Sequence, residues 1–282
     1  MDVRSYLKSK IPEEELRFIP RSFDIIGSRE KAVAIVEIPE EIYHRRVLIA
    51  EAIMKIHKNV KTVLAKRSPR VGVYRTRNYE LIAGDPNTEV IHKEHGCYFK
   101  LDPTKVYFSP RESTERLRIA RQVAPGDFVV LMFAGVCPYG IVIAKVQPLV
   151  KKIVAIEINP IAYNYMVENI KLNKLEDKIM PVLGDVKVET SKWYGMADRV
   201  IMPLPKGAQY YLDEAFNCLR EDGGIIHFYH WAHEENLYDE AITIIEEHAR
   251  KHNYKIEILN KRKVLSYAPR IYKICIDFRA FR

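Results

Sequence analysis

The feature that most constrains the fold is the regular alternation, from residue 104 onward, of short apolar runs and longer segments with helical spacing. The apolar runs have the length of strands that are buried within a sheet. Alternation of this kind predicts a parallel sheet with helices on both faces. We expect its strands near residues 128–133, 152–157, 179–184, 199–202 and 224–229.

The end of the chain departs from this alternation. Its last segment, YKIEILNKRKVLSYAPRIYKICIDFRAF, contains two β-rich runs with no helix between them. Two adjacent strands with a short connection form an antiparallel hairpin. We therefore predict that residues 104–282 form one α/β domain whose sheet is completed by a C-terminal antiparallel hairpin.

Residues 1–103 show a different, mixed pattern. A helix is predicted at residues 45–60, where apolar residues recur at helical spacing, and a strand is predicted at residues 31–38. Residues 88–101 fit a hairpin that turns near Gly96. We expect this part to be a smaller α+β domain that contacts the partner of the protein.

Composition excludes several classes of protein. The chain has 282 residues with 48% hydrophobic content, enough for a sizeable core, but no apolar run long enough to span a membrane. It begins without the apolar segment of a signal peptide, so we expect a soluble, cytoplasmic protein. Its four cysteines are too widely spaced for a zinc site or a disulfide framework: Cys97, Cys137, Cys218 and Cys275.

A cluster of histidines near the C-terminus raises the question of a metal. His227, His230 and His233 are three residues apart and are followed by Glu234. On a continuing strand, His227 and His230 point to opposite faces, so their ring nitrogens do not converge. We predict no metal site.

The net charge of the chain suits a polyanionic partner. The sequence has 45 Lys and Arg against 37 Asp and Glu, a formal charge of +8. The segment KTVLAKRSPRVGVYRTRNY, residues 61–79, has interleaved cations and tyrosines and no acidic residue. Such a segment either grips phosphates and stacks on bases, as RNA recognition requires, or is a solvated loop of a basic protein. Its candidate RNA ligands are Lys66, Arg67, Arg70, Arg75 and Arg77. Nothing in the sequence indicates an obligate protein partner.

The loop after the first predicted parallel strand is where open α/β sheets bind their ligands. A dinucleotide site requires glycines at three spaced positions and free amides for a pyrophosphate. Here the three positions are Gly135, Cys137 and Gly140, and Pro138 has no N–H to donate. The loop is therefore a poor cradle for phosphate.

S-adenosylmethionine fits the same loop better, because it carries no phosphate. It needs a close backbone approach near Ala134 and Gly135, and a carboxylate at the end of the second strand for its ribose hydroxyls. Glu157 ends that strand, and Asp185 ends the next one, where it would face the adenine amino group. Each acid taken alone is equally well explained as a polar residue at a strand end. Together they predict a cofactor site.

The fourth strand ends in Pro203, Leu204 and Pro205. Many methyltransferases that act on nucleobase nitrogens have Asn, Asp or Ser followed by two prolines at this point, where the side chain and carbonyls orient the target. Here the carbonyls remain and the side-chain acceptor is missing. The alternative is a rigid exit from the strand.

Several strings taken together identify a family. The strings YFSPR and TERLRI, FAGV, AIEINPIAYNYMVENIKLNKLEDKI, VIMPLPKGA, GGIIHFYH and YAPRIY resemble the archaeal and eukaryotic tRNA (guanine-37-N1)-methyltransferases. The resemblance covers about residues 40–282. It implies a Rossmann-like methyltransferase fold, S-adenosylmethionine as cofactor, and methyl transfer to N1 of the guanosine at tRNA position 37, next to the anticodon.

The resemblance also implies roles for single residues. Glu115 is the general base that removes the N1 proton, and Arg75 steadies the negative charge that develops on guanine O6. Pro203 belongs to both the catalytic and the cofactor site, and Arg111 is a further tRNA ligand. The implied cofactor set is Tyr107, Arg116, Phe133, Ala134, Gly135, Val136, Glu157, Ile158, Asn159, Asp185, Val186 and Pro203. Without the resemblance, Glu115 reads as an ion-pair partner of Arg111 or Arg118 on an exposed helix face.

The chain departs from the family pattern at three places. Leu131 stands where the family usually has Asp, Cys137 where it has Gly, and Pro203 where it has Asn. With only about 100 residues before the catalytic domain, we expect the extra N-terminal domain of many family members to be absent. The loss of an acceptor at Pro203 fits an archaeal branch that methylates carbon C7 of the tricyclic wyosine precursor, alone or in addition.

Three other functions remain open. A related enzyme of wybutosine synthesis transfers the aminocarboxypropyl group of the same cofactor, but its Gly-Tyr pair at the fourth strand is absent here. The altered loop is also compatible with a tRNA-binding protein that has lost its cofactor site. The last alternative is a nicotinamide dinucleotide site.

Overall fold

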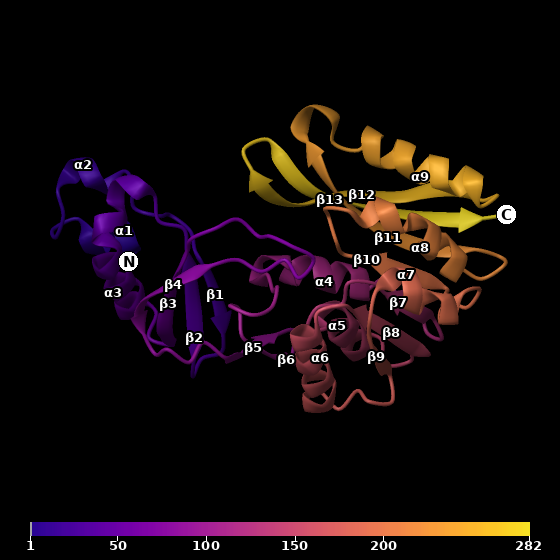
Figure 1. Cartoon of the computed structure of the whole chain (residues 1–282), viewed down its shortest axis with the longest axis horizontal. Helices are drawn as coiled ribbons and strands as arrows, with labels where there is room; N and C mark the ends of the chain where they lie inside the picture. The colour runs from indigo at the N-terminus through magenta and orange to yellow at the C-terminus, as the bar shows by residue number, and fades with distance from the viewer. Residues whose placement is uncertain (1) are drawn as a thin grey trace. The chain divides into compact units, whose positions relative to one another are not determined.

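A computed structural model describes residues 2–282. The chain divides into two compact units, Met1–Pro110 and Arg111–Arg282, which appear in Figure 1 in indigo to magenta and in magenta to yellow. This division falls a few residues after the boundary predicted at residue 103. No helix among residues 2–282 has the length and apolar character needed to cross a membrane.

Unit 1 is a small α+β structure. Its four-stranded sheet has the order β1-β2-β3-β4, and β5 and β6 form a separate hairpin. The strands are β1 (Asp24–Gly27), β2 (Ala32–Val36), β3 (Val60–Lys66), β4 (Tyr79–Gly84), β5 (Val90–Glu94) and β6 (Cys97–Leu101). The helices are α1 (Val3–Leu7), α2 (Glu13–Leu16), η1 (Glu40–Arg45) and α3 (Arg46–Ile56). Side chains of α1 and α3 pack on β2 and β3 to form its core.

The structure confirms the α+β class of this unit and refines its elements. The predicted helix is α3, but it ends at Ile56, because the following residues enter β3 beside β2. The predicted hairpin is β5–β6, and its turn residues His95 and Gly96 both have left-handed φ values, 48° and 73°. The segment predicted to bind RNA begins inside β3, where Val63, Leu64 and Ala65 are buried.

Unit 2 contains a seven-stranded sheet of order β12-β13-β11-β10-β7-β8-β9. Its strands are β7 (Phe128–Leu131), β8 (Lys152–Glu157), β9 (Ile179–Leu183), β10 (Arg199–Met202), β11 (Gly224–His233), β12 (Lys255–Ala268) and β13 (Ile271–Phe281). Its α-helices are α4 (Ser113–Ala120), α5 (Pro138–Val146), α6 (Pro160–Leu172), α7 (Val186–Glu189), α8 (Leu212–Cys218) and α9 (Asp239–Lys251). Short 3-10 turns are η2 (Pro110–Glu112), η3 (Thr190–Trp193), η4 (Ala208–Tyr211) and η5 (Glu234–Asn236).

The strand order reverses at β7. The chain runs outward through β8 and β9 on one side, then returns to build β10 and β11 on the other, all parallel. A crevice at such a reversal, at the carboxyl ends of the strands, is the usual ligand site of open α/β sheets. The α/β class with a terminal antiparallel hairpin is confirmed, since β13 pairs antiparallel with both β11 and β12.

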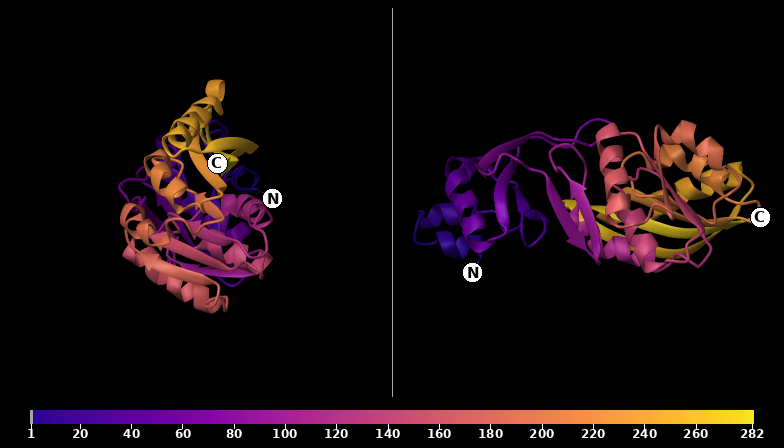
Figure 2. Two further views of the ribbon diagram at one scale, coloured as in Figure 1. Left: turned by 90° about the vertical axis from the view of Figure 1, so that its right-hand side faces the viewer. Right: turned by 90° about the horizontal axis from the view of Figure 1, so that it is seen from below.

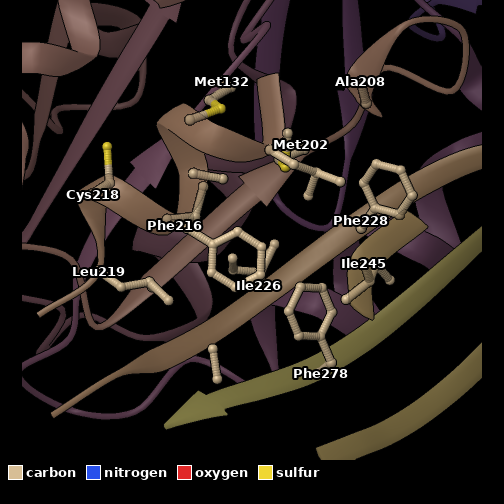
Figure 3. Packing of buried hydrophobic residues seen from close by; sticks show 14 of the residues in the cluster. Met132, Met202, Ala208, Phe216, Cys218, Leu219, Ile226, Phe228, Ile245 and Phe278 are labelled. Atoms are coloured by element: carbon tan, nitrogen blue, oxygen red, sulfur yellow. The ribbon is translucent and has the colours of Figure 1, made fainter. Parts of the chain in front are cut away.

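Helices lie on both sides of this sheet, as the right-hand view of Figure 2 shows. On one face, α8 and α9 close an apolar core that includes Phe216, Phe228 and Phe278 (Figure 3). The other face of β11 and β13 carries polar residues and is covered by α4, whose Arg118 binds Asp277. Strand β11 is longer than predicted, because all its residues through His233 pair with β13.

Candidate active site

The loop between β7 and α5 has an unusual backbone. Phe133, Gly135 and Cys137 alternate through it with left-handed φ values of 55°, 59° and 71°. Only glycine adopts this conformation at little cost, so the two other residues store local strain. The loop turns sharply in this way at the carboxyl end of the first parallel strand, where the sequence predicted the cofactor.

Glu157 fixes this loop to the neighbouring strand. Its Oε2 accepts a hydrogen bond from the Gly135 amide at 2.7 Å, and its Oε1 accepts one from the Asn159 amide at 2.8 Å. Two amide donors hold the carboxylate at the end of β8 in one orientation. A carboxylate held in one orientation at a strand end is a suitable acceptor for the hydroxyls of a ribose.

Two other predicted cofactor residues cap helices. The Asn159 side chain accepts from the Ile161 amide at 3.0 Å at the start of α6, and the Asp185 side chain accepts from the Lys187 amide at 2.9 Å at the start of α7. Helix capping alone therefore explains why Asn and Asp occupy these two positions. The proposed contact between Asp185 and adenine therefore stays a prediction.

The Pro203 segment is tied to β11. The Leu204 amide donates to the Met202 carbonyl at 2.8 Å, which makes a tight turn around Pro203. The Pro205 carbonyl, expected to face the target base, accepts from the Trp231 amide at 3.1 Å. Phe133 and Tyr211 meet edge to face at 5.0 Å between ring centres, beside this segment.

The prediction that Glu115 lies on an exposed helix face is wrong. Its side chain is buried, and Arg118 donates to both carboxylate oxygens, at 2.7 Å and 2.8 Å. The Tyr229 hydroxyl donates to Oε1 at 2.6 Å. Of the two ion-pair partners expected from the helix pattern, Arg118 is the one that binds. Oε1 accepts two of these hydrogen bonds and Oε2 accepts one, so Oε2 has the greater remaining capacity to accept a hydrogen bond.

A chain of buried polar groups continues behind Glu115. Arg118 also binds Asp277, whose Oδ1 accepts from His227 Nδ1 at 2.6 Å. Arg199 binds the other ring nitrogen of His227 at 2.7 Å and reaches Asp127 at 3.1 Å. Sequence reasoning missed Asp277, although a charged residue in the middle of an apolar strand is a signal of a buried partner.

Burial and charge act in opposite directions within this chain. Burial alone would raise the pKa of Asp277, but the bonds from His227 and Arg118 outweigh it and hold that pKa well below its usual value. Burial lowers the pKa of His227 and outweighs the opposing effect of Asp277. Glu115 is thus anchored to a rigid, charged scaffold.

Residues on either side of Glu115 differ in exposure. Arg116 is buried, whereas Arg111 is exposed.

Glu112 is buried and accepts from Lys273 at 2.8 Å, a second buried ion pair that joins the start of α4 to β13. Both ion pairs fix α4 against the sheet, because either partner left alone would carry a buried, uncompensated charge.

In unit 1, the predicted RNA ligands fall into two groups. Lys66 and Arg67 form ion pairs with Glu37, Glu40 and Glu80. By contrast, Arg70, Arg75 and Arg77 have no carboxylate within 4.0 Å among residues 2–282. The guanidinium groups of Arg70 and Arg75 lie 4.5 Å and 4.0 Å from the centre of the Tyr107 ring.

This second group is a concentrated positive charge. Burial lowers the pKa of Arg70, and the charges of Arg75 and Arg77 act in the same direction. The Nε of Arg77 is buried without a hydrogen-bond partner. We call Arg70, Arg75 and Arg77 the arginine cluster, and its uncompensated charge favours an anionic ligand.

Comparison with known proteins decides the family. Residues 90–257 match the model of the TRM5/TYW2 methyltransferase domain, and residues 3–88 match that of the TYW2 N-terminal domain. The chain belongs to the TRM5/TYW2 family.

Its relatives in this family are named for several activities at tRNA position 37. The chain is 47% identical to the tRNA (guanine(37)-N(1))-methyltransferase Trm5b of Pyrococcus abyssi, over 95% of this chain and 78% of that one. It is 31% identical to the tRNA(Phe) (4-demethylwyosine(37)-C(7)) aminocarboxypropyltransferase of Pyrococcus horikoshii, over 99% and 96%. The solved complex of aTrm5 and tRNALeu is 38% identical, with a TM-score of 0.85, and covers 99% of this chain and 78% of that one.

Two of the three positions at which the resemblance implied a departure lie close together. A Cβ built on Gly140 would lie 2.6 Å from Cys137 Sγ and 3.4 Å from Leu131 Cδ2. Cys137 is fully buried, and burial raises the pKa of its thiol to about 12, so it is an inert packing group. Leu131 and Cys137 therefore fill the space beneath the cofactor loop.

One group of side chains has the composition of a metal site. Within residues 2–282, His227, Cys275 and Asp277 bring possible ligand atoms within 4.8 Å of one another. Both ring nitrogens of His227 are already engaged, and two arginines add positive charge. His230 lies apart, 3.7 Å from Glu240 on α9. The group is a hydrogen-bonded network, and the expectation of no metal site stays a prediction.

Proposed function

We propose that this protein transfers the methyl group of S-adenosylmethionine to N1 of guanosine at position 37 of tRNA, within the anticodon loop. The observation that carries the proposal is the buried carboxylate of Glu115, which Arg118 and Tyr229 hold in one orientation. Guanine N1 is protonated at neutral pH, so its methylation requires a base of this kind. Positioned general bases contribute about 10²- to 10⁴-fold to such reactions.

The cofactor supplies an electrophilic methyl group and leaves as its demethylated product. Glu157 would bind the ribose hydroxyls, because its carboxylate is fixed by two amides at the end of β8. The backbone near Ala134 and Gly135 would approach the cofactor closely, with Phe133 and Val136 beside it. Asp185, Asn159 and the Pro203 turn belong to the same predicted set.

The arginine cluster supports a role for unit 1 in tRNA binding. Arg75 would steady the charge that develops on guanine O6 when N1 loses its proton. Arg70 and Arg77 are the better phosphate ligands of the segment, because Lys66 and Arg67 are already neutralised by glutamates. The guanidinium groups of Arg70 and Arg75 both lie over the ring of Tyr107.

A second candidate is aminocarboxypropyl transfer to C7 of the wyosine precursor. It is favoured by the match of residues 3–88 to the TYW2 N-terminal domain and by the 31% identity to the Pyrococcus horikoshii relative. Methyl transfer to the same carbon, alone or beside N1, is favoured by Pro203, which leaves the target edge without a side-chain acceptor.

Product analysis separates these functions. The protein is incubated with S-adenosylmethionine and a tRNA transcript that has unmodified guanosine at position 37 or, separately, tRNA that carries the tricyclic intermediate. The nucleosides are then identified by mass spectrometry. We expect 1-methylguanosine from the first substrate. An aminocarboxypropyl product or exclusive action on the tricycle would move the function to the corresponding alternative, and no transfer to either would reject an enzyme of this class.

A further inference from the structure

A row of aromatic side chains leads away from Glu115 along one face of the sheet. Tyr229 and Trp231 are two residues apart on β11, so their side chains lie on the same face. Tyr229 donates to Glu115, and Trp231 is the next side chain toward the end of the strand. The ring of Tyr267, on β12, lies 4.4 Å from the ring of Trp231, measured between centres. The row therefore runs from Glu115 to the terminal hairpin.

This row extends past the carboxyl edge of the parallel strands. Met202, the last residue of β10, pairs with Phe228, whereas β11 continues to His233 and stays paired with β13. The outer part of β11, residues 229–233, therefore has no β10 residue opposite it. The amide of Trp231 binds the carbonyl of Pro205, which ties the aromatic pair to the Pro203 segment.

The outer end of the row is open to solvent. The Tyr267 side chain is 61% exposed, although its ring contacts Trp231 at one side. The two rings are tilted by 41°, so they are not stacked in parallel. An exposed aromatic ring that is held by a second ring offers a flat surface to another planar group.

A cation lies on the same face. Arg262 and Tyr229 are both opposite Cys275, which places Arg262 on the same face as Tyr229, whereas its neighbours Lys261 and Lys263 alternate to the other face. Arg262 is exposed and has no carboxylate within 4.0 Å in the described part of the chain, residues 2–282. Cations beside an aromatic surface are the combination by which proteins bind single-stranded nucleic acid.

We propose that Trp231 and Tyr267 form a stacking platform for an unpaired nucleobase of the tRNA next to the target nucleotide, with Arg262 as a ligand of an adjoining phosphate. The proposal rests on the proposed function, because it takes tRNA as the substrate and Glu115 as the base. The ligand class follows from the flat aromatic surface, the uncompensated charge of Arg262 and the direct connection to Glu115 through Tyr229. It adds a tRNA contact in unit 2 to those assigned to unit 1.

Kinetics of Tyr267 variants test the platform. Loss of base stacking costs about 5- to 150-fold in affinity. Tyr267→Leu, which keeps bulk but removes the flat ring, should raise KM for unmodified tRNA within that range with little change in kcat. Tyr267→Phe should stay within about twofold of the unaltered protein by the same argument. Tyr194→Leu is the matched control, because Tyr194 is exposed and follows Trp193, which packs on Phe128 at the start of β7.

Fluorescence gives an independent readout. The protein has two tryptophans, so Trp193→Phe leaves Trp231 as the only one. This change is tolerable, since the buried indole N–H of Trp193 has no hydrogen-bond partner. We expect tRNA to quench Trp231 in this background and in its Tyr267→Phe form. We expect much weaker quenching with Tyr267→Leu.

The outcomes separate the two proposals. If tRNA binds and is methylated with unaltered KM in Tyr267→Leu, and Trp231 fluorescence does not respond, the platform is rejected and the function stands. If the unaltered protein neither binds nor modifies tRNA, the proposed function fails and the platform fails with it. Melting curves of each variant ensure that a raised KM does not come from unfolding.

Discussion

Cys137 occupies the space that any side chain at residue 140 would need, since its Sγ lies 2.6 Å from a Cβ built on Gly140. In most helices a Gly→Ala change is stabilising by roughly 1 kcal/mol. Here the added methyl meets a buried sulfur in a packed core.

We predict that Gly140→Ala destabilises the protein by about 1–3 kcal/mol, the usual cost of overpacking. In a Cys137→Gly background the same change should be nearly neutral, because the sulfur is gone and glycine accepts the left-handed φ of 71° at this residue. Denaturant unfolding of the four proteins in this cycle measures the coupling. Additive effects would show that the two residues do not compete for space.

Glu157 is predicted to control cofactor affinity alone. Glu157→Ala removes the acceptor of two backbone amides and of the ribose, so calorimetry should detect no binding of S-adenosylmethionine. The affinity for tRNA should change little, because RNA docking uses other residues. Glu176→Gln, at an exposed site, is the control. Loss of both affinities together would indicate misfolding.

Glu115→Gln should reduce methylation of guanine N1 by about 10²- to 10⁴-fold, as expected for a lost general base. Attack by the electron-rich carbon of the tricycle needs no prior deprotonation, so any carbon methylation should fall less. Tyr229→Phe keeps the ring and removes one donor to Glu115, and we expect a smaller loss of N1 methylation. Glu247→Gln, on the exposed side of α9, should leave the rate unchanged. Equal loss of both methylations in Glu115→Gln would instead indicate that Glu115 acts only as a structural ion-pair partner of Arg118.

The salt dependence of tRNA binding should distinguish the two groups of cations in unit 1. Each lost phosphate contact lowers the slope of log K against log salt by about 0.7–0.9. The double variant Arg70→Ala/Arg77→Ala should therefore flatten this slope clearly. Lys66→Ala/Arg67→Ala should flatten it less, because both cations are already paired with glutamates. If Lys66→Ala/Arg67→Ala instead flattens the slope more than Arg70→Ala/Arg77→Ala, the RNA binds at the β3 end of residues 61–79.

The buried His227 predicts a pH dependence of stability. Its pKa is lowered in the folded state by burial, so the unfolded chain binds a proton more readily. Stability contributed by the neutral ring is complete above the unfolded pKa of about 6.5 and declines as the pH falls below it. His227→Gln should flatten the change in the free energy of unfolding between about pH 7 and pH 5. If the dependence of the unfolding free energy on pH is unchanged, groups other than His227 cause the loss of stability at acid pH.

The sheet was predictable from the sequence because strands buried on both faces leave a local signature. The five parallel strands lie where apolar runs predicted them, and the glycine-bearing loop and Glu157 follow from their order along the chain. The extra length of β11 was not predictable, because it depends on pairing with β13, a strand far away in the sequence.

The environment of Glu115 was beyond local patterns for the same reason. The helix pattern gave Arg118 as a possible partner but placed both residues on an exposed face. Tyr229, which lies 114 residues away in the sequence, and Asp277, which is 159 residues from Arg118, bury this pair. The buried Lys273 is likewise explained by Glu112, which approaches from another element.

Strand β12 forms one edge of the large sheet, and within residues 2–282 no strand pairs with its outer side. Open edges of this kind are templates for pairing with another chain and hence for aggregation. Three irregularities in its pairing with β13, together with Lys261, Arg262 and Lys263, make a flat match to a second strand unfavourable. Removal of these charges would therefore cost solubility, and variants of this strand require a check of their association state.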